Sequence, residues 1–442
     1  MTEPPSGKPY TRYAGQDGAP SDGAPDRASS GPAAAPPHEP RRGSSGGRPP
    51  HRRRSGFILL LVIFAALVLA AAAVAAVHPF GGGAKDAPAN TAQAGASGAQ
   101  ATGRPTATQT PRPTATPTPK PTATPKSFTV TAGGDTMGGF AVSSVVGRLG
   151  AGLFKSIAPV FKASEYGFVN LESPLTYHGD PQSWKDVVIK GNPALAPALA
   201  KSGIDVVTLA NNHAGDQGDS GLLDTLKYCA QDHIAVVGAG RDLAGARRGV
   251  VLKKNGVRVA YLGFADVLPA GYPATSTSPG TSPGRADISA VKKAIKTAAG
   301  KSDFVVVGWH WNFEYKTAPT ALELSEGHDA IDAGADLVFA HHPHVLDGVQ
   351  AYHGGLICYS LGNLVFSGFG GTGAQTMLVK TRVTKQAIDA QLIPVQIDSL
   401  GIPTLAHGGM AATILSRVRS LSANLGTRVK IANGKGYVHV TR

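Results

Sequence analysis

Five apolar segments of this chain each lead to a residue that can bind a metal ion, and this pattern constrains the fold more than any other feature. The segments are FTVTAG before Asp135, YGFVNL before Glu172, IDVVTLA before Asn212, FVVVGW before His310 and DLVFAH before His342. Short apolar runs rich in Val and Phe are typical of buried strands. Because α/β proteins gather metal ligands at the carboxyl ends of separate strands, we expect these side chains and His344 to meet in one cleft.

Strand and helix patterns alternate from Phe128 onward, which is typical of a layered α/β fold. Helices are expected within 180–203, 220–233, 287–300 and 320–334. Hairpins are expected at Asn255-Gly256 and around His353-Gly354-Gly355, so the sheets cannot be purely parallel. Two sheets packed together and covered by helices fit this mixture best. Residues 386–442 add strands and one helix without an evident core of their own, so we predict a single domain over 128–442.

The amino-terminal part has a different composition. Residues 1–56 are rich in Pro, Gly, Ser and Arg and almost lack Leu, Ile and Val. Such a segment cannot bury enough apolar surface to offset the entropy of ordering. We therefore predict that residues 1–56 are a disordered basic tail.

Residues 57–77 are 21 consecutive residues without a polar side chain, long enough to cross a bilayer as a helix. Arg52, Arg53 and Arg54 directly precede this run and favour a cytoplasmic amino terminus, which would place residues 78–442 outside the cytoplasm. A cleaved signal peptide and a buried core helix are the alternatives. The long basic segment before the run exceeds an ordinary signal-peptide n-region, which favours an uncleaved single-pass anchor in the cell membrane.

Residues 78–127 connect this run to the domain and contain an octapeptide written three times, as RPTATQTP, RPTATPTP and KPTATPKS. Proline at this density keeps a chain extended at about 3.1 Å per residue. We predict an extracellular Pro/Thr-rich stalk, whose threonines are open to glycosylation.

The positive charge is concentrated at the amino-terminal end. Residues 1–126 hold 14 Lys and Arg against 6 Asp and Glu, so +8 of the formal charge of +13 lies there and +5 remains. Anionic headgroups of the membrane are the expected partner of that first part, and nothing favours nucleic acid. The mildly basic domain is compatible either with an anionic polymer or with an ordinary solvated surface.

Two cysteines, Cys229 and Cys358, match no metal-binding motif. Outside the cytoplasm the two cysteines could form one disulfide, but neither their spacing nor their neighbours require it. Buried free thiols remain an equal alternative.

Single residues of the expected cleft also have structural explanations. Asp135 in GGDTMGGF fits a turn aspartate as well as a ligand, and His213 fits a histidine bonded to nearby backbone. However, successive side chains diverge, so His213 is better placed to meet a substrate than the ion of Asn212, and a histidine suits the general acid. In an extended segment His342 and His344 would share one face and His341 the other, which makes the first two the ligand pair.

The chain resembles the capsule-synthesis (CapA-like) family associated with bacterial poly-γ-glutamate production. The resemblance lies in six segments that occur in the family's order: GGDTMGGF, NLESPLT, LANNHAGDQG, HWNFEY, HHPHVLDGVQAY and YSLGNLVF. That family is similar in fold to the calcineurin-like metallophosphoesterases, which implies a four-layer α/β/β/α sandwich. It also implies one or two divalent ions, with Mn, Fe and Zn as the candidates.

The resemblance assigns a role to each site residue. One ion would take Asp135, Glu172 and His344. The other would take Glu172, Asn212, His310 and His342, with His213 as the acid. The same motifs mark further residues as supports for the ligands or contacts for the substrate: Asn211, Glu314, Tyr315, His341 and Asn363.

Three residues depart from the related patterns. Met137 stands where the phosphoesterase pattern has a histidine ligand, and a thioether is a poor ligand for a hard ion. Glu172 replaces the usual bridging aspartate, and Asn312 stands where the family usually carries glycine. The loss of the histidine leaves one ion or two as open alternatives.

Two functions follow from the resemblance. The first is a membrane-anchored, extracellular, metal-dependent hydrolase that acts on a phosphoester or a γ-glutamyl polymer, with His213 protonating the leaving group. The second is a non-catalytic assembly or export factor that binds the anionic polymer beside other membrane proteins of capsule synthesis. His213 separates them, because hydrolysis needs an acid and binding does not.

Overall fold

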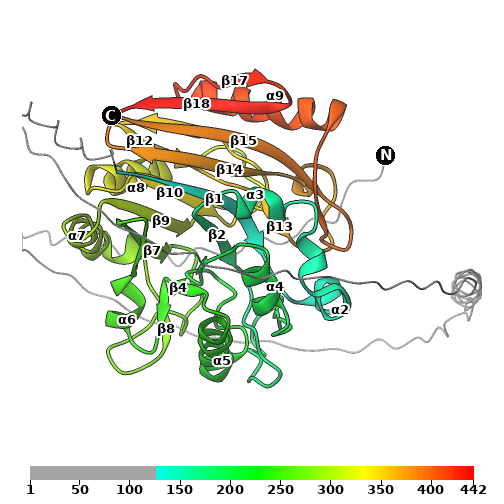
Figure 1. Cartoon of the computed structure of the whole chain (residues 1–442). Helices are drawn as coiled ribbons and strands as arrows, with labels where there is room; N and C mark the ends of the chain where they lie inside the picture. The colour runs from blue at the N-terminus through cyan, green and yellow to red at the C-terminus, as the bar shows by residue number, and fades with distance from the viewer. Residues whose placement is uncertain (1–125) are drawn as a thin grey trace, which may run out of the picture. The chain divides into compact units, whose positions relative to one another are not determined.

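The computed structural model describes residues 126–442, which form a mixed α/β domain with two large sheets (Figure 1). The predicted tail at 1–56, the apolar run at 57–77 and all but the last two residues of the stalk predicted at 78–127 lie outside the described residues. The predicted stalk overlaps the first strand by one residue, because that strand begins at Ser127. Within residues 126–442 no helix is both long enough and apolar enough to cross a membrane.

The larger sheet has ten strands in the order β17-β18-β15-β14-β1-β2-β3-β4, with β13 beside β1 and β16 beside β15. Its strands are β1 (Ser127–Thr136), β2 (Tyr166–Leu171), β3 (Val206–Thr208), β4 (Ala235–Val237), β13 (Asn363–Val365), β14 (Gln375–Thr384), β15 (Ala387–Ile397), β16 (Pro403–Leu405), β17 (Lys430–Ala432) and β18 (Lys435–Thr441). β1 to β4 are parallel, and β14 returns antiparallel to β1.

The second sheet has six strands in the order β11-β12-β10-β9-β7-β6. They are β6 (Val250–Lys254), β7 (Val257–Ala265), β9 (Phe304–His310), β10 (Leu337–His341), β11 (Val349–Tyr352) and β12 (Gly355–Cys358). The central strands β7, β9, β10 and β12 are parallel. β6–β7 and β11–β12 are the two hairpins expected from Asn255-Gly256 and His353-Gly354, and both are confirmed. A small pair, β5 (Ala239–Gly240) and β8 (Gly280–Thr281), lies apart from both sheets.

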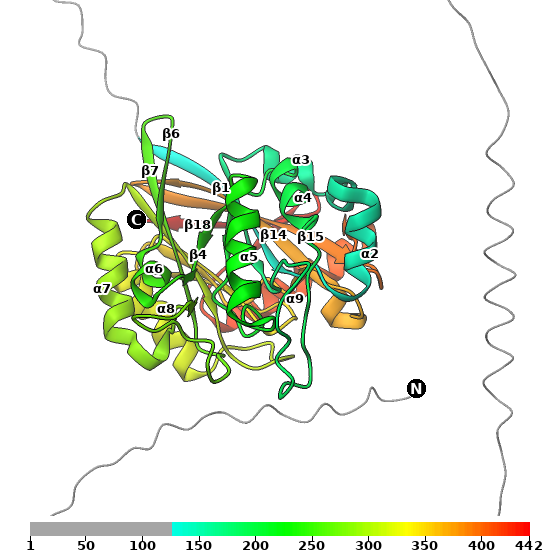
Figure 2. The ribbon, with the colours of Figure 1, turned by 90° about the horizontal axis from the view of Figure 1, so that it is seen from below.

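Helices pack against both sheets. The helices are α2 (Phe140–Leu149), α3 (Ala158–Lys162), α4 (Leu195–Lys201), α5 (Gly218–Gln231), α6 (Leu243–Arg248), α7 (Ile288–Ala299), α8 (Ala321–Asp332) and α9 (Gly408–Asn424). α4, α5, α7 and α8 confirm the four predicted helices. Figure 2 shows α2, α3 and α4 on one side of the sheets and α7 and α8 on the other.

Three apolar clusters hold these elements together. One lies between the sheets, where Phe168 of β2 stacks on Tyr261 of β7 at 6.2 Å. A second joins the ten-stranded sheet to α2–α5, and a third joins the six-stranded sheet to α7 and α8. Ile414 of α9 and Leu392 of β15 belong to the cluster between the sheets. The carboxy-terminal segment therefore shares the core of the domain, as predicted, and has no core of its own.

Cys229 and Cys358 are both buried and free. This resolves the choice left open by the sequence in favour of free thiols. Burial raises the pKa of the Cys229 thiol to about 12, so the thiolate is scarce at neutral pH.

Gly134 fixes the end of β1 against the loop before β13. A Cβ atom at Gly134 would lie 1.8 Å from the carbonyl oxygen of Gly362, whose neighbour Asn363 begins β13. The amide of Asp135 donates to that same oxygen at 2.9 Å. Only glycine permits this approach, and the approach sets the position of Asp135.

We predict that Gly134→Ala lowers the free energy of unfolding by at least about 1–3 kcal/mol, because the added methyl group separates two backbone segments. Urea denaturation measures this change. Gly409→Ala is the matched control, since the methyl group it adds meets no atom within 4 Å beyond its chain neighbours and the backbone of its own helix. Equal unfolding midpoints for the two variants would show that the contact at Gly134 is not a constraint.

Candidate metal centre

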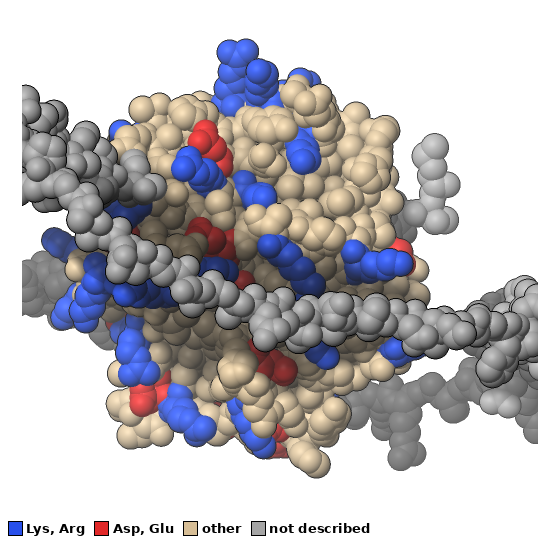
Figure 3. Space-filling view, viewed as in Figure 1, with Lys and Arg blue, Asp and Glu red and all other residues tan. Residues whose placement is uncertain are grey.

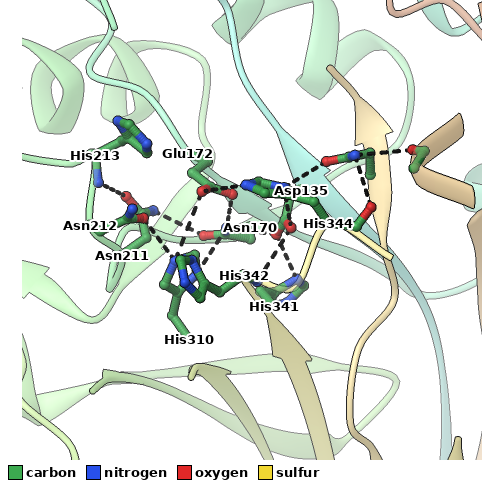
Figure 4. Close-up of polar contacts among 12 residues, drawn as sticks. Asp135, Asn170, Glu172, Asn211, Asn212, His213, His310, His341, His342 and His344 are labelled. Atoms are coloured by element: carbon green, nitrogen blue, oxygen red, sulfur yellow. Dashed lines mark hydrogen bonds and ion pairs between the residues drawn. The ribbon is translucent and has the colours of Figure 1, made fainter. Parts of the chain in front are cut away.

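Two carboxylates stand at the carboxyl ends of neighbouring parallel strands. Asp135 is the penultimate residue of β1, Glu172 directly follows β2, and both are fully buried. Asn170 joins them, because its amide nitrogen donates to Asp135 Oδ1 at 2.9 Å and to Glu172 Oε2 at 3.0 Å (Figure 4). Asn170 is a polar residue inside an otherwise apolar strand, and no motif in the sequence predicted its role.

Four imidazoles reach the carboxylates from the other sheet. His310 ends β9 and His341 ends β10, and His342 and His344 follow in the next turn. His344 Nδ1 lies 3.2 Å from Asp135 Oδ2, and its Nε2 lies 3.7 Å from Glu172 Oε1. His310 Nε2 lies 3.8 Å from Glu172 Oε1 and 2.9 Å from Asn212 Oδ1. The structure thus brings together all the side chains that the sequence marked as ligands.

These side chains form two overlapping sets of possible ligands. In each set the ligand atoms lie within 4.8 Å of one another. The first set is Asp135, Glu172 and His310, and the second set is Glu172, His342 and His344. Glu172 belongs to both, as expected of a bridging carboxylate. The two sets differ from the expected ones in one respect, because His310 groups with Asp135 and His344 groups with His342.

The local electrostatics differ sharply between the two carboxylates. Burial, together with the neighbouring Asp135 carboxylate, raises the pKa of Glu172 well above its ordinary value. Burial also acts to raise the pKa of Asp135, but contacts with His341 and His344 outweigh it and hold that pKa well below its usual range. Burial lowers the pKa of His342 to about 3 and that of His310 well below its ordinary value. His310 and His342 are therefore neutral near pH 7, which is the form that binds a metal ion.

Several buried polar atoms of this cluster have no hydrogen-bond partner among the described residues. They are Glu172 Oε1, His342 Nδ1 and both ring nitrogens of His341. Buried polar atoms are normally bonded, so several unpaired ones within one cluster require an explanation. A divalent cation would satisfy Glu172 and His342, which both belong to the sets of possible ligands, and carboxylate, imidazole and amide donors suit Mn²⁺, Fe²⁺ or Zn²⁺. The residues present therefore fit a divalent metal ion.

His213 lies at the edge of the cluster, within a buried polar network (Figure 4). Its Nδ1 is 2.6 Å from Asp216 Oδ2. Lys185 Nζ donates to Asp216 Oδ1 at 2.5 Å and to the carbonyl oxygen of Asn212 at 2.6 Å. The hydroxyl group of Tyr272 also donates to Asp216, at 2.8 Å. Since Asp216 holds Nδ1, the other ring nitrogen of His213 is the one available to exchange a proton.

Lys185, Asp216 and Tyr272 were not among the site residues predicted from the sequence. Asp216 carried the only local signal, because it lies one turn after His213 in the same motif. Lys185 lies in a long loop whose sequence resembles a solvated segment, yet its side chain is only 2% exposed. Burial lowers the pKa of Lys185, an effect that Asp216 partly offsets.

The predicted supporting residues have different surroundings. Asn211 donates to Asn170 Oδ1 and to the carbonyl oxygen of Leu171, both at 2.9 Å. Asn363 accepts from His344 Nδ1 at 2.8 Å and so leaves Nε2 toward Glu172. Glu314 is half-buried and Tyr315 is exposed. The Tyr315 ring lies 6.4 Å from the ring of Phe369, which in turn packs on His344.

The expected geometry of the histidine cluster was wrong. The prediction assumed an extended segment with His341 on the opposite face, but φ is 98° at His342 and 57° at His344. The backbone therefore turns after β10, and His341 Nδ1 lies 3.3 Å from Asp135 Oδ1. All three histidines face the carboxylates. Pattern arguments that assume a continuing strand fail where a turn begins.

The three residues that depart from the related patterns have local explanations. Met137 is fully buried in the cluster beneath α2–α5, and its sulfur accepts from the amide of Gly139 at 3.1 Å. It is therefore a packing residue. Asn312 has a φ of 71°, which glycine adopts at less cost. Glu172 lies at the junction of the two ligand sets, as described above.

Comparison with known proteins gives a consistent set of relatives. The family model described as bacterial capsule synthesis protein PGA_cap matches residues 129–368. The PGA biosynthesis protein CapA of Bacillus subtilis is 39% identical over 236 residues, 53% of this chain and 62% of that protein. The capsule biosynthesis protein CapA of Bacillus anthracis is 36% identical over 248 residues, 54% of this chain and 60% of that protein. This chain thus spans about three fifths of the length of these two relatives.

A third relative is matched over more of its length. A probable polyglutamine synthesis accessory protein of Mycobacterium tuberculosis is 30% identical over 288 residues, 60% of this chain and 75% of that protein. Among solved structures, a 5′-nucleotidase precursor of Thermus thermophilus matches with a TM-score of 0.33 and 14% identity, over 64% of this chain and 54% of the other. Structural likeness at that level is too remote to support an inference.

Proposed function

This chain belongs to the bacterial capsule synthesis protein PGA_cap family, and from that membership and the geometry of the centre we propose that it is a metal-dependent hydrolase of capsule synthesis. The observation that supports the proposal most is the setting of Glu172. Its Oε1 is buried, has no hydrogen-bond partner among residues 126–442, and faces His310 and His344 at 3.8 and 3.7 Å. Such an arrangement is costly unless a cation completes it.

The ligands of the ion would be Asp135, Glu172, Asn212, His310, His342 and His344. A bound divalent ion supplies positive charge that stabilises an oxyanion developing on the substrate. Asn170 links the two carboxylates through one hydrogen bond to each, and Asn363 fixes the ring of His344. These contacts set the geometry of the ligands before any ion or substrate arrives, as outer contacts of metal ligands generally do.

His213 is the proposed general acid. Asp216 accepts from Nδ1, so Nε2 is the atom that would hold the proton and pass it to the leaving oxygen or nitrogen of the substrate. Burial lowers the pKa of His213, and the contact with Asp216 opposes that effect. The net effect is a lowered pKa, so His213 gives up its proton more readily than a solvent-exposed imidazole.

The substrate class that we propose is a phosphoester or a γ-glutamyl polymer. The relatives carry names that refer to capsule, PGA and polyglutamine synthesis, which favours a glutamyl polymer and other proteins of the capsule machinery as partners. The alternative function is a non-catalytic assembly or export factor for the polymer. The buried contact between His213 and Asp216 favours hydrolysis, because a polymer-binding factor has no need of an oriented imidazole.

The proposal extends to the whole chain. The domain at 128–442 would be a four-layer α/β/β/α sandwich of the metallophosphoesterase type. A Pro/Thr-rich linker at 78–127, a membrane helix at 57–77 and a basic cytoplasmic tail at 1–56 would tether it to the outer face of the cell membrane. The apolar run and the three arginines before it support this arrangement.

We predict that a protease added to intact cells releases the domain by cutting within residues 78–127, because a proline-rich linker offers extended backbone to the protease. Immunoblotting with antibodies against the domain and against the tail detects the products. Protection of the domain together with cleavage of the tail would reverse the proposed orientation. Lysed cells are the control, because there the protease reaches both the linker at 78–127 and the tail at 1–56.

Hydrolysis itself is tested with the purified protein on a γ-glutamyl polymer and on a phosphodiester, with Mn²⁺ or with a chelator. We expect turnover of at least one substrate that the chelator abolishes and Mn²⁺ restores. If the metal-loaded protein turns over neither substrate, the assembly factor becomes the better proposal.

A further inference from the structure

The strands after the family match form an open groove on one face of the ten-stranded sheet. Its volume is about 550 Å³, and its walls and floor come from β14, β15, β17, β18 and the start of β1. On this face Leu378 of β14 lies opposite Ile393 of β15, and both belong to the apolar cluster beneath α2–α5. Two residues further along β14, the next cross-strand pair on the same face is Lys380 and Gln391. The groove thus begins where the helices stop covering the sheet. The family match ends at residue 368, before all of these strands except β1.

The groove carries an excess of positive charge. Lys380, Arg382, Arg428 and Lys430 line it, and none of them forms an ion pair with any residue of the described part of the chain. The one carboxylate in the lining, Asp389, accepts from His439 Nδ1 at 2.7 Å. Figure 3 shows basic side chains over this half of the sheet. Because the whole chain after residue 126 has a formal charge of only +5, these unpaired cations mark a local concentration.

The four cations form two pairs on opposite walls. Lys380 and Arg382 alternate along β14, and Arg428 and Lys430 lie before and at the start of β17, so the members of each pair are about 7 Å apart. β15 and β18 lie between them as the floor, which separates the walls by about 14 Å at the usual strand spacing. A small anion can contact only one wall. An extended chain that carries many anionic groups can contact both.

The lining favours a soluble polyanion over a membrane surface. Peripheral membrane sites combine basic side chains with exposed apolar side chains that enter the lipid. None of the exposed large hydrophobic residues of the described chain lines this groove. Single-stranded nucleic acid would require exposed rings for base stacking, whereas the only phenol or indole ring in the lining, that of Tyr437, is half-buried.

We propose that this groove binds an extended polycarboxylate chain. Guanidinium groups pair with carboxylates through two parallel hydrogen bonds, and lysines add point charges. Arg382 and Arg428 supply one guanidinium group to each wall. The groove is separate from the metal centre, because Thr129 in its lining lies six residues before Asp135 on β1, which is about 20 Å. Binding in the groove does not require hydrolysis at the centre, although the choice of a glutamyl polymer as the probe rests on the proposed function.

The test compares two triple variants of the full chain, purified in detergent, with fluorescent poly-γ-glutamate as the probe. The groove variant is Arg382→Gln, Arg428→Gln and Lys430→Gln. The control is Lys293→Gln, Lys296→Gln and Lys301→Gln, three exposed lysines on and after α7 that also have no acidic partner within residues 126–442. Both variants lose the same net charge. We expect at least about a tenfold loss of affinity in the groove variant and less than about a twofold loss in the control. Equal losses would overturn the proposal.

A second measurement on the unaltered chain locates the polymer directly. Carbodiimide coupling joins carboxylates to nearby lysines, and we expect poly-γ-glutamate to couple to Lys380 and Lys430 in preference to Lys293 and Lys296. Coupling without preference would contradict the assignment. Competition by polyphosphate or single-stranded DNA as strong as that by the polymer would show a general polyanion surface. Weaker binding of the groove variant to anionic vesicles, with polymer binding unchanged, would show a membrane surface.

Discussion

His213→Ala is expected to lower the rate of hydrolysis of a substrate with a poor leaving group by about 10²–10⁴-fold, because it removes the group that protonates the leaving atom. The imidazole belongs to neither set of possible metal ligands, so the variant should keep its metal. Its Nδ1 contact with Asp216 at 2.6 Å shows that the ring is held in one orientation. The measurement is the kcat of the variant and of the wild type on an alkyl phosphodiester, whose leaving group is poor. The metal content of both proteins is determined alongside.

The corresponding nitrophenyl phosphodiester is the control substrate. Its leaving group departs without a proton, so the variant should retain most of its activity on it. Equal losses on both esters would indicate displaced metal ligands rather than a missing acid, and would contradict the role given to His213.

Asp216→Asn is expected to lower the free energy of unfolding by about 3–5 kcal/mol, the usual cost of leaving a buried charge without its partner. The Lys185 side chain is 2% exposed and the Asp216 side chain 0% exposed, and their charged groups are 2.5 Å apart. No other carboxylate of the described chain forms an ion pair with Lys185. Urea denaturation of the metal-free protein measures the loss.

The control is a double-mutant cycle with Lys185→Met. Removal of the ammonium group should restore a large part of the stability lost in Asp216→Asn, so the two changes together should cost less than their sum. Strictly additive losses would contradict a direct interaction between the two side chains.

The positions of the proposed ligands were accessible from sequence because they depend on strand ends. Asp135 and His310 each follow an apolar run, and parallel strands present their carboxyl ends at one edge of a sheet. The pattern alone therefore predicted that the side chains at the carboxyl ends of β1, β2, β9 and β10 meet in one cleft. The alternation of helices and strands and the two hairpins were accessible for the same reason, since each has a local signal.

Other parts of the centre depend on contacts that no local pattern encodes. Asn170 lies within a buried strand, and its role arises only because β1 and β2 pair with Asp135 opposite it. Lys185 becomes buried only when the loop that carries it folds over His213 and Tyr272. The turn at His342 and His344 places non-glycine residues at positive φ, and no glycine in the sequence marks that turn.

The most direct test of the metal centre is the metal content of the purified protein, determined by elemental analysis in the wild type and in Glu172→Gln. Because Glu172 is the residue shared by both ligand sets, we expect one or two equivalents of Mn, Fe or Zn per wild-type chain and loss of most of it in the variant. His353→Gln is the control, since His353 is exposed and paired only with Asp332, and it should keep the wild-type content. Absence of any divalent metal from the wild type, or equal content in wild type and Glu172→Gln, would contradict a metal centre at these residues.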